Sequence, residues 1–344
     1  METRARTRGR FRVGCLVLTA VSAAIVAGCG GDGHSQDSPA SGSPSVAPTT
    51  QPLTGLPLAA GSAAATRPAL FVKIENAPQA RPQTGLDQAD VVYEAIAEGG
   101  ITRFAAIFQS ADPGDLGPVR SVRPQDPDIA APLRAIAGYS GGVAPIVNDL
   151  SSVAQNLSAD TSAAASAYHR TSDRSAPHNL YATASKLWAL AATPYDSPPL
   201  PLFEYGALPA GATPASAADV PLSGVADVRW TWDGKAWRRS QDGAPFTVTG
   251  SGRIGPTNVI LQYVQIVSAG YEDVAGTPVP SSVVIGTGKA QLLRDGKVLT
   301  GTWSKPSRFD VTRFTTTDGQ PLTLRPGQTW VELVPNTASV TVTP

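Results

Sequence analysis

The hydrophobic pattern of a folded chain begins near Pro68, where short apolar runs alternate with turn-forming residues. Three of these runs are rich in Val, Ile and Phe and are separated by Pro, Gly and Asp, which is typical of β-strands. They lie at 69–76, 90–97 and 102–110. Apolar positions at helical spacing predict helices over 124–139 and 179–192, and 142–147 predicts a further small strand. Strands that alternate with helices predict an α/β domain over 68–207.

The pattern changes after a Pro- and Ala-rich connector at 208–221. Three Asp-Gly pairs flanked by β-type runs predict hairpins, because Asp-Gly favours the tight turns that join antiparallel strands. These hairpins span 228–243, 290–303 and 314–335. Residues 222–344 are therefore predicted to form a mostly antiparallel β domain. The expected fold class is mixed α+β and α/β, with the α/β domain first and the β-rich domain second.

The N-terminus predicts export from the cell. Residues 1–28 combine a basic start with a short apolar segment, as in a secretory signal peptide. Val26-Ala27-Gly28-Cys29 resembles a bacterial lipobox, which implies cleavage before Cys29 and lipidation of its thiol; an ordinary signal peptide with an incidental Cys29 is the alternative. Residues 29–67, rich in Gly, Ser, Pro and Ala, predict a flexible tether. We expect a protein that is lipid-anchored at the outer face of the bacterial cytoplasmic membrane.

Cysteine usage and charge exclude several classes of function. The other cysteine, Cys15, lies in the segment predicted to be removed, so thiolate catalysis, Cys-ligated zinc and iron–sulfur clusters are excluded. We expect no cofactor. Removal of residues 1–28 takes away five arginines and one glutamate, which changes the net charge from 0 to −4. An exported, mildly acidic chain is a poor partner for nucleic acid.

Charged residues make up only 16% of the chain, so their clusters are candidate sites. Arg120 and Arg123 stand three residues apart before a predicted helix, where guanidinium groups suit an anion or ion pairs to nearby carboxylates. Glu94 and Glu98 could act as paired carboxylates if the chain bends at the glycines after Glu98. The alternative is that Glu98 pairs with Arg103 across that turn.

The segment 168–182 contains two of the three histidines of the chain. Asn179 is a candidate N-cap for the predicted helix, which would place His178 and Arg174 beside a positive helix end. That position suits anion binding or acid/base chemistry, although His178 could equally lock the loop through a backbone carbonyl. A metal site from His169, His178 and Asp173 is weakly indicated because the ligand spacing is irregular. We expect no metal.

Residues 138–142 match the G-x-S-x-G motif of α/β-hydrolase nucleophiles. The motif needs a strand before the serine and a helix after it. Here a helix is predicted before Ser140 and a strand after it, so the sequence favours an ordinary Gly-rich turn.

Several motifs together resemble the YerB-like bacterial lipoprotein family. They are VKIENAPQARPQTGLDQADVVYEAIAEGGITRF, GPVRSVRP and APHNLY in the first domain, and VRWTWDGKAWRRSQDG, NVILQYV, GKAQLLRDGKVLTGTWSK and GQPLTLRPGQTWVELVP in the second. The resemblance covers 68–336 and implies a surface lipoprotein with an α/β domain followed by a β-rich domain. It implies no reaction.

The scarce charges gather near turns and predicted helix starts, where ligand groups often converge. We predict a polar cleft in the first domain, lined by Glu94, Glu98, Arg103, Arg120, Arg123, Arg174, His178 and Asn179. Its ligand would be a cell-wall fragment or another anionic or glycan component of the envelope. A hydrolase with His178 or Glu98 as acid/base is the first alternative, and catalysis is less expected than binding. A module that regulates wall-assembly proteins through Trp230, Trp232 and Trp237 is the second, although such tryptophans more often pack within a sheet.

Overall fold

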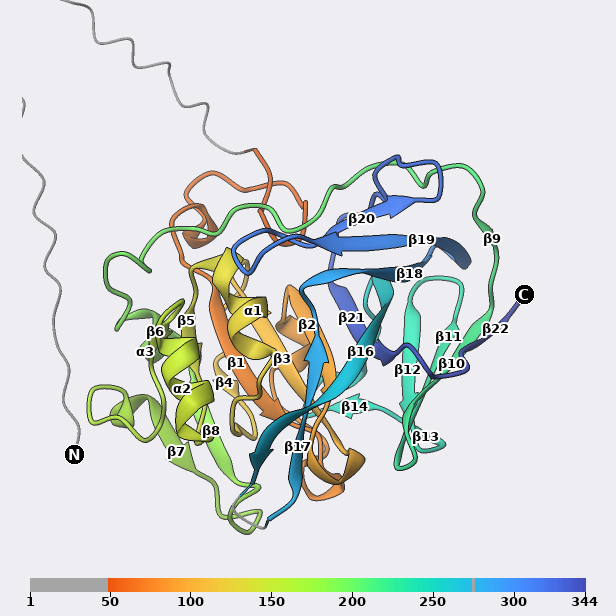
Figure 1. Ribbon diagram of the computed structural model, residues 1–344. Helices are drawn as coiled ribbons and strands as arrows, with labels where there is room; N and C mark the ends of the chain where they lie inside the picture. Colours follow the sequence, from red (N-terminus) through yellow and green to blue (C-terminus); the bar gives the residue numbers. More distant parts are fainter. Residues whose placement is uncertain (1–48, 274–275) are drawn as a thin grey trace, which may run out of the picture. The chain divides into compact units, whose positions relative to one another are not determined.

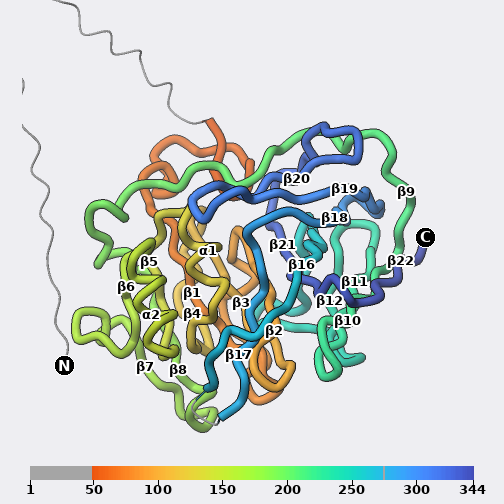
Figure 2. Tube along the Cα trace, in the orientation of Figure 1, coloured from red at the N-terminus to blue at the C-terminus, as the bar shows by residue number. Residues whose placement is uncertain are grey.

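The computed structural model describes residues 49–273 and 276–344 (Figures 1 and 2). The predicted signal peptide, Cys29 and the first part of the predicted tether lie outside these residues. All the described residues belong to one unit of the chain.

One sheet of 12 strands contains strands from both halves of the sequence. The first half means the residues up to 207 and the second half the residues from 208 onward. Its main path is β20-β19-β18-β16-β21-β2-β3-β1-β5-β6, with β17 paired to β16 and β9 paired to β19. In chain order these strands are β1 Leu70–Glu75, β2 Val91–Ile96, β3 Thr102–Phe108, β5 Ile136–Gly138, β6 Gln155–Asn156, β9 Thr213–Pro214, β16 Asn258–Glu272, β17 Pro278–Val283, β18 Gly286–Arg294, β19 Lys297–Lys305, β20 Arg313–Thr316 and β21 Thr329–Pro335. Strand β21 joins the halves, because it pairs in parallel with β2 on one side and with β16 on the other.

Three smaller sheets complete the β structure of the described residues. The largest has the order β13-β12-β11-β10-β22, and all its pairings are antiparallel. Its strands are β10 Ala217–Ser223, β11 Ala226–Trp232, β12 Trp237–Gln241, β13 Ala244–Pro245 and β22 Thr341–Thr343. The other two sheets contain β4 Asp115–Leu116, β7 Tyr168–Arg170 and β8 Leu180–Thr183, and β14 Thr247–Val248 with β15 Gly252–Arg253.

Helices are short, and the α-helices of the described residues all lie before residue 190 (Figure 1). The α-helices are α1 Asp126–Ala130, α2 Ala144–Ser151 and α3 Ala184–Trp188. Single 3₁₀ turns are formed by Ala63–Ala65, Pro78–Ala80, Leu86–Gln88, Glu98–Gly100, Ala131–Leu133 and Ala165–Ala167. The mixed fold class is therefore confirmed, with helices among strands first and mostly antiparallel sheets second.

Three predicted elements are wrong in type or extent. The helix predicted over 124–139 stops at Ala130, because Pro132 prevents its continuation and Arg134 adopts a left-handed φ of 48°. The strand predicted at 142–147 is the start of α2, where Pro145 occupies a first-turn position that tolerates proline.

The helix predicted over 179–192 begins only at Ala184. The residues before it form β8, which pairs with β4 and β7. Tertiary pairing overrides the local helical pattern there.

The large sheet is covered on both faces, and strand alternation decides which face each side chain joins. On β1, Leu70, Val72 and Ile74 pack into one apolar cluster. Phe71 packs into the other cluster together with Ile129 of α1. Lys73 and Glu75 follow Phe71 at two-residue intervals, so they lie on the face that α1 and α2 cover.

The second half supplies an aromatic cluster on the opposite face. Trp230 and Trp330 pack edge to face with ring centroids 5.5 Å apart, and Phe104 of β3 packs on Trp330 at 5.2 Å. Trp230 and Trp237 are fully buried. They stabilise the contact between sheets and are not accessible as anchors for a protein partner.

Candidate functional site

A cleft of about 310 Å³ opens beside the start of β3. Its walls come from the β2–β3 turn, β3, the segment 120–123, the start of α2 and the β16–β17 arm. The residues that line it are Glu98, Arg103, Arg120, Ser121, Val122, Arg123, Gly141, Gly142, Val143, Ile146, Asp273 and Val279. This cavity, called the Glu98 cleft below, brings together Glu98, Arg103, Arg120 and Arg123 of the predicted site.

Glu98 is placed by the tight turn between β2 and β3. Gly99 and Gly100 have φ values of 65° and 77°, a region that glycine adopts with little strain. One carboxylate oxygen, Oε2, accepts a hydrogen bond from Arg123 and lies 3.5 Å from Nη2 of Arg103. The other oxygen, Oε1, is buried and has no hydrogen-bond partner among the described residues. Its hydrogen-bonding capacity is therefore unused in this structure.

Arg103 and Arg123 are nearly buried, with 5% and 6% of their surface exposed, and each donates a hydrogen bond to a backbone carbonyl. Arg123 Nη1 donates to the Val122 carbonyl at 2.7 Å, and Arg103 Nη1 donates to the Ser121 carbonyl at 3.4 Å. Burial lowers the pKa of Arg123, and the negative charge of Glu98 opposes that shift. The Nε atoms of both arginines are buried without a hydrogen-bond partner among the described residues. Two positioned cations therefore border the cleft, although their buried Nε atoms are not exposed to it.

A buried ion pair lies behind the cleft and fixes the segment that carries Arg123. Lys73 Nζ donates to Asp126 Oδ1 at 2.8 Å, and both side chains are almost completely buried. The second oxygen of Asp126 accepts the backbone N–H of Arg123 at 2.6 Å. Burial lowers the pKa of Lys73, and the charge of Asp126 opposes this effect. The pair thus positions a residue of the cleft without being exposed to a ligand.

Arg120 and His178 share one carboxylate, that of Glu75 at the end of β1. Glu75 Oε1 lies 3.1 Å from Arg120 Nε, an ion pair without hydrogen-bond alignment, and Oε2 lies 3.0 Å from His178 Nδ1. The Glu75 side chain is 2% exposed, whereas those of Arg120 and His178 are about a quarter exposed. Glu75 also faces Arg103 across the strands, because the two residues are register partners. His178 is thereby linked to the arginine cluster, although it does not line the Glu98 cleft itself.

Sequence reasoning missed Lys73, Glu75 and Asp126. A signal was present in LFVKIE, where charged residues occupy two alternate positions of an otherwise apolar strand. All six residues of β1 are buried. Charged residues on a strand covered on both faces need partners inside the protein, so such positions mark an internal ionic network.

Glu94 lies on the other face of the sheet and is not part of the cleft. Its two oxygens accept hydrogen bonds from Arg239 Nη2, both at 2.7 Å, and Thr102 and Asn76 also donate to it. Strand alternation explains this placement, because β2 ends at Ile96 and the following turn redirects Glu98. The four-residue spacing of Glu94 and Glu98 therefore did not place the two carboxylates together, because Glu98 lies in the turn after the strand.

Arg174 and Asn179 make structural contacts outside the cleft. Arg174 donates to the carbonyls of Ala80 and Pro82 at 2.6 and 2.7 Å, which fixes the loop after β1. Asn179 accepts from Arg170 Nη1 and donates to the Thr171 carbonyl, both at 2.8 Å. Because no helix starts at Asn179, the predicted helix end beside His178 is wrong.

The two histidines of segment 168–182 have different partners. His169 Nε2 lies 3.5 Å from Asp115, whereas His178 contacts Glu75. Asp173 lies 3.8 Å from its neighbour Arg174. Within residues 49–273 and 276–344, no group of three or more His, Cys, Asp or Glu is placed to hold a metal ion.

The region around Ser140 does have the strand–turn–helix order that the serine motif needs. Strand β5 ends at Gly138 and α2 begins at Ala144, which corrects the order predicted from the sequence. Ser140 nevertheless has no positive φ, and its hydroxyl contacts no histidine among the described residues. Without a base to activate it, Ser140 does not have the arrangement of a nucleophile.

The Glu98 cleft therefore offers features suited to a polar anionic ligand. Three guanidinium groups and the carboxylates of Glu98 and Asp273 line it, and the carboxylate of Glu75 pairs with Arg120 from outside the lining. Helix α2 starts at the cleft, and its N-cap residue Val143 provides no side-chain cap, so its first N–H groups favour a negative charge. Asp273 and Val279 come from the second half of the sequence, and the other lining residues come from the first.

No helix in the described ranges combines the length and the apolar content needed to span a membrane. Residues 53–195 match the family described as "Protein of unknown function (DUF3048) N-terminal domain", and residues 218–331 match its C-terminal domain. The protein named "Putative lipoprotein YerB" of Bacillus subtilis (strain 168) is 30% identical over 293 residues, which are 83% of this chain and 86% of that protein. The crystal structure of YerB from Bacillus subtilis matches with a TM-score of 0.73 and 27% identity, covering 86% of this chain and 99% of that one. The resemblance in the motifs is thus confirmed, and the chain belongs to the DUF3048 family that includes YerB-like lipoproteins.

Proposed function

We propose that the protein is a lipid-anchored lipoprotein that binds an anionic or glycan component of the cell envelope in the Glu98 cleft. The observation that supports the proposal is that Arg103, Arg120 and Arg123 line one cavity together with Glu98. Arginines recognise carboxylates and phosphates through paired N–H donors. A carboxylate oxygen beside them suits a sugar hydroxyl or an ammonium group. A ligand that carries both an acidic group and hydroxyls uses both features.

The name of the relative as a lipoprotein and the lipobox-like sequence before Cys29 support the anchor. Leu53 and Ala64, in the last part of the predicted tether, are buried in the folded body. A lipid on Cys29 would therefore hold the cleft near the outer face of the cytoplasmic membrane. Fragments of the wall are the anionic glycans present there. The ligand is therefore expected to be a wall fragment with a carboxylate or a phosphate.

Arg120 offers the sharpest test, because its side chain is 26% exposed and can be changed without emptying the core. We expect the mature protein in detergent to bind a muramidase digest of peptidoglycan, glucuronate or inorganic phosphate, measured by calorimetry, and not to bind neutral glucose. Arg120→Gln should weaken binding about tenfold, since a hydrogen bond to a charged group contributes about 1.5–3 kcal/mol. Arg229→Gln is the matched control, because Arg229 is an exposed, ion-paired arginine of another sheet.

Equal affinity of wild type and Arg120→Gln for every anionic probe would contradict the proposed site. Hydrolysis of the digest by the wild type, lost in Glu98→Gln or His178→Ala variants that remain folded, would replace binding by catalysis as the function. A protein partner bound through the second half, with no effect of Arg120→Gln, would favour the wall-assembly alternative.

A further inference from the structure

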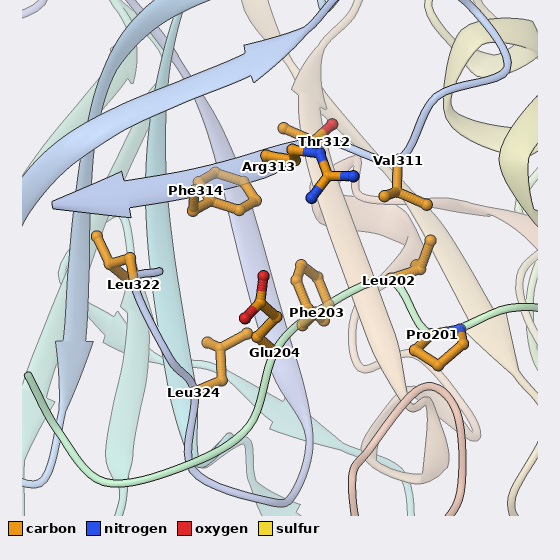
Figure 3. Close-up of a pocket in the computed structure, with 10 residues that line it drawn as sticks. All are labelled: Pro201, Leu202, Phe203, Glu204, Val311, Thr312, Arg313, Phe314, Leu322 and Leu324. Atoms are coloured by element: carbon orange, nitrogen blue, oxygen red, sulfur yellow. The ribbon is translucent and has the colours of Figure 1, made fainter. Parts of the chain in front are cut away.

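A second cavity, of about 230 Å³, lies between the segment 201–204 and the sheet-edge strand β20 (Figure 3). Its apolar walls include Phe203 and Phe314, whose ring centroids are 6.2 Å apart with the planes tilted by 39°. Leu322 and Leu324 complete the floor, and both are almost fully buried. The cavity shares no lining residue with the Glu98 cleft.

Backbone hydrogen bonds hold these walls in place. The N–H of Leu324 donates to the Glu204 carbonyl at 2.8 Å, and the N–H of Gly206 donates to the Leu324 carbonyl at 2.9 Å. On the other side, the N–H of Leu322 donates to the Phe314 carbonyl at 2.9 Å. The cavity is therefore built by paired backbone segments rather than by loose side chains.

Two opposite charges border this apolar space. Figure 3 shows the carboxylate of Glu204 and the guanidinium of Arg313 directed toward the opening between the walls. No ion pair within 4.0 Å joins the two groups, and neither is paired with another charged side chain in residues 49–273 and 276–344. The Glu204 carboxylate and the Arg313 guanidinium thus line the same cavity without forming an ion pair with each other.

We propose that this cavity binds a free α-amino acid with an apolar side chain of about the size of leucine. The ammonium group would contact Glu204, the carboxylate would contact Arg313, and the side chain would lie against the apolar wall that Phe203, Phe314 and Leu324 form. A volume of 230 Å³ is below the roughly 300–1,000 Å³ of pockets for drug-sized ligands, so a molecule the size of one residue fits better. An internal residue of a peptide carries neither of the two charges, and a hydrocarbon ligand would leave both groups unused.

Calorimetric titrations of the mature protein in detergent with three related compounds separate the contribution of the ligand carboxylate from that of the ligand ammonium group. L-leucine carries both charges, L-leucinamide lacks the carboxylate, and 4-methylpentanoate lacks the ammonium. We expect saturable binding of L-leucine and about tenfold weaker binding of each of the other two, as for loss of one charged hydrogen bond.

Substitutions of Glu204 and Arg313 test which charged group of the ligand each residue contacts. Glu204→Gln should weaken L-leucine and L-leucinamide about tenfold and leave 4-methylpentanoate unchanged. Arg313→Gln should weaken L-leucine and 4-methylpentanoate similarly and leave L-leucinamide unchanged. Asp227→Asn and Lys297→Gln are matched controls, because both residues are exposed and lie outside this cavity.

Absence of saturable L-leucine binding would overturn the proposal, as would equal affinity for all three compounds. Equal effects of both substitutions on all three compounds would also overturn it, because the charges would then act only on the stability of the cavity.

Discussion

Arg239 is the cation on which the buried polar network between the two halves of the sequence depends. It is fully buried and donates from Nη2 to both oxygens of Glu94 at 2.7 Å. Its Nη1 donates to Gln241 at 3.0 Å, and its guanidinium lies 4.2 Å from the ring centroid of Phe246. Glu332, also fully buried, lies 4.0 Å from its Nε. One cation therefore lies between two buried carboxyl groups.

Arg239→Met keeps most of the side-chain volume and removes the charge. Removal of one partner of a buried ion pair costs about 3–5 kcal/mol, because the remaining charge stays buried without compensation. A domain with a stability of about 5–15 kcal/mol would lose a large part of it. Urea unfolding followed by tryptophan fluorescence measures the loss, since Trp230 and Trp330 are buried beside the network. We expect a lower midpoint with an unchanged slope.

The pH dependence of this variant provides the stricter test. Burial raises the pKa of Glu332 and the charge of Arg239 opposes that shift, so without Arg239 the folded state favours protonated Glu332 more strongly and the destabilisation should shrink as the pH falls from 8 to 5. A second substitution, Glu94→Gln, should restore part of the lost stability in the Arg239→Met background. Arg229→Met on the neighbouring strand is the matched control and should cost at most about 1 kcal/mol, because its ion pair with Asp219 is exposed. A loss below about 1 kcal/mol for Arg239→Met, or the same loss at pH 5 and pH 8, would refute this account of the network.

Two further predictions concern Glu332 and the anchor. Burial and the nearby charge of Glu94 raise the pKa of Glu332 well above its usual value, so the folded state binds a proton more readily than the unfolded state and stability falls as the pH rises through that range. Glu332→Gln should flatten this pH dependence and leave the protein more stable than the wild type at pH 8 in urea unfolding; an unchanged dependence would assign it to other groups. Cys29→Ala should move the protein from the membrane fraction to the soluble fraction after cell disruption, if lipidation occurs there; retention in the membrane by the variant would point to another anchor.

The fold class could be predicted because local signals and tertiary structure agree over most strands. The Asp-Gly turns at Asp233-Gly234 and Asp295-Gly296 join β11 to β12 and β18 to β19 as expected. The helices were predicted less well, because a strand pairing partner far away in the sequence leaves no local trace. Residues 180–183 have a helical pattern but pair with β4 and β7.

Part of the candidate site could be predicted from the sequence for a similar reason. Glu98, Arg103, Arg120 and Arg123 lie near turns, and the structure brings them to one cavity. Glu94 was misplaced because the sequence does not show which face of β2 meets the second half. Lys73 and Glu75 were overlooked because charged residues on an apolar strand gain a role only when a partner such as Asp126 or Arg120 is known.

The central position of β21 has a consequence for the order in which the chain can fold. Val91 of β2 pairs with Thr329, and Asn258 of β16 pairs with the same residue. Until the segment beyond residue 328 is in place, the adjacent edges of β2 and β16 have no strand between them. Such open edges can pair with other chains, and contacts this distant in sequence form slowly. A truncation before Thr329 would leave these two edges permanently unpaired with β21, so the last part of the chain closes the sheet that the first part begins.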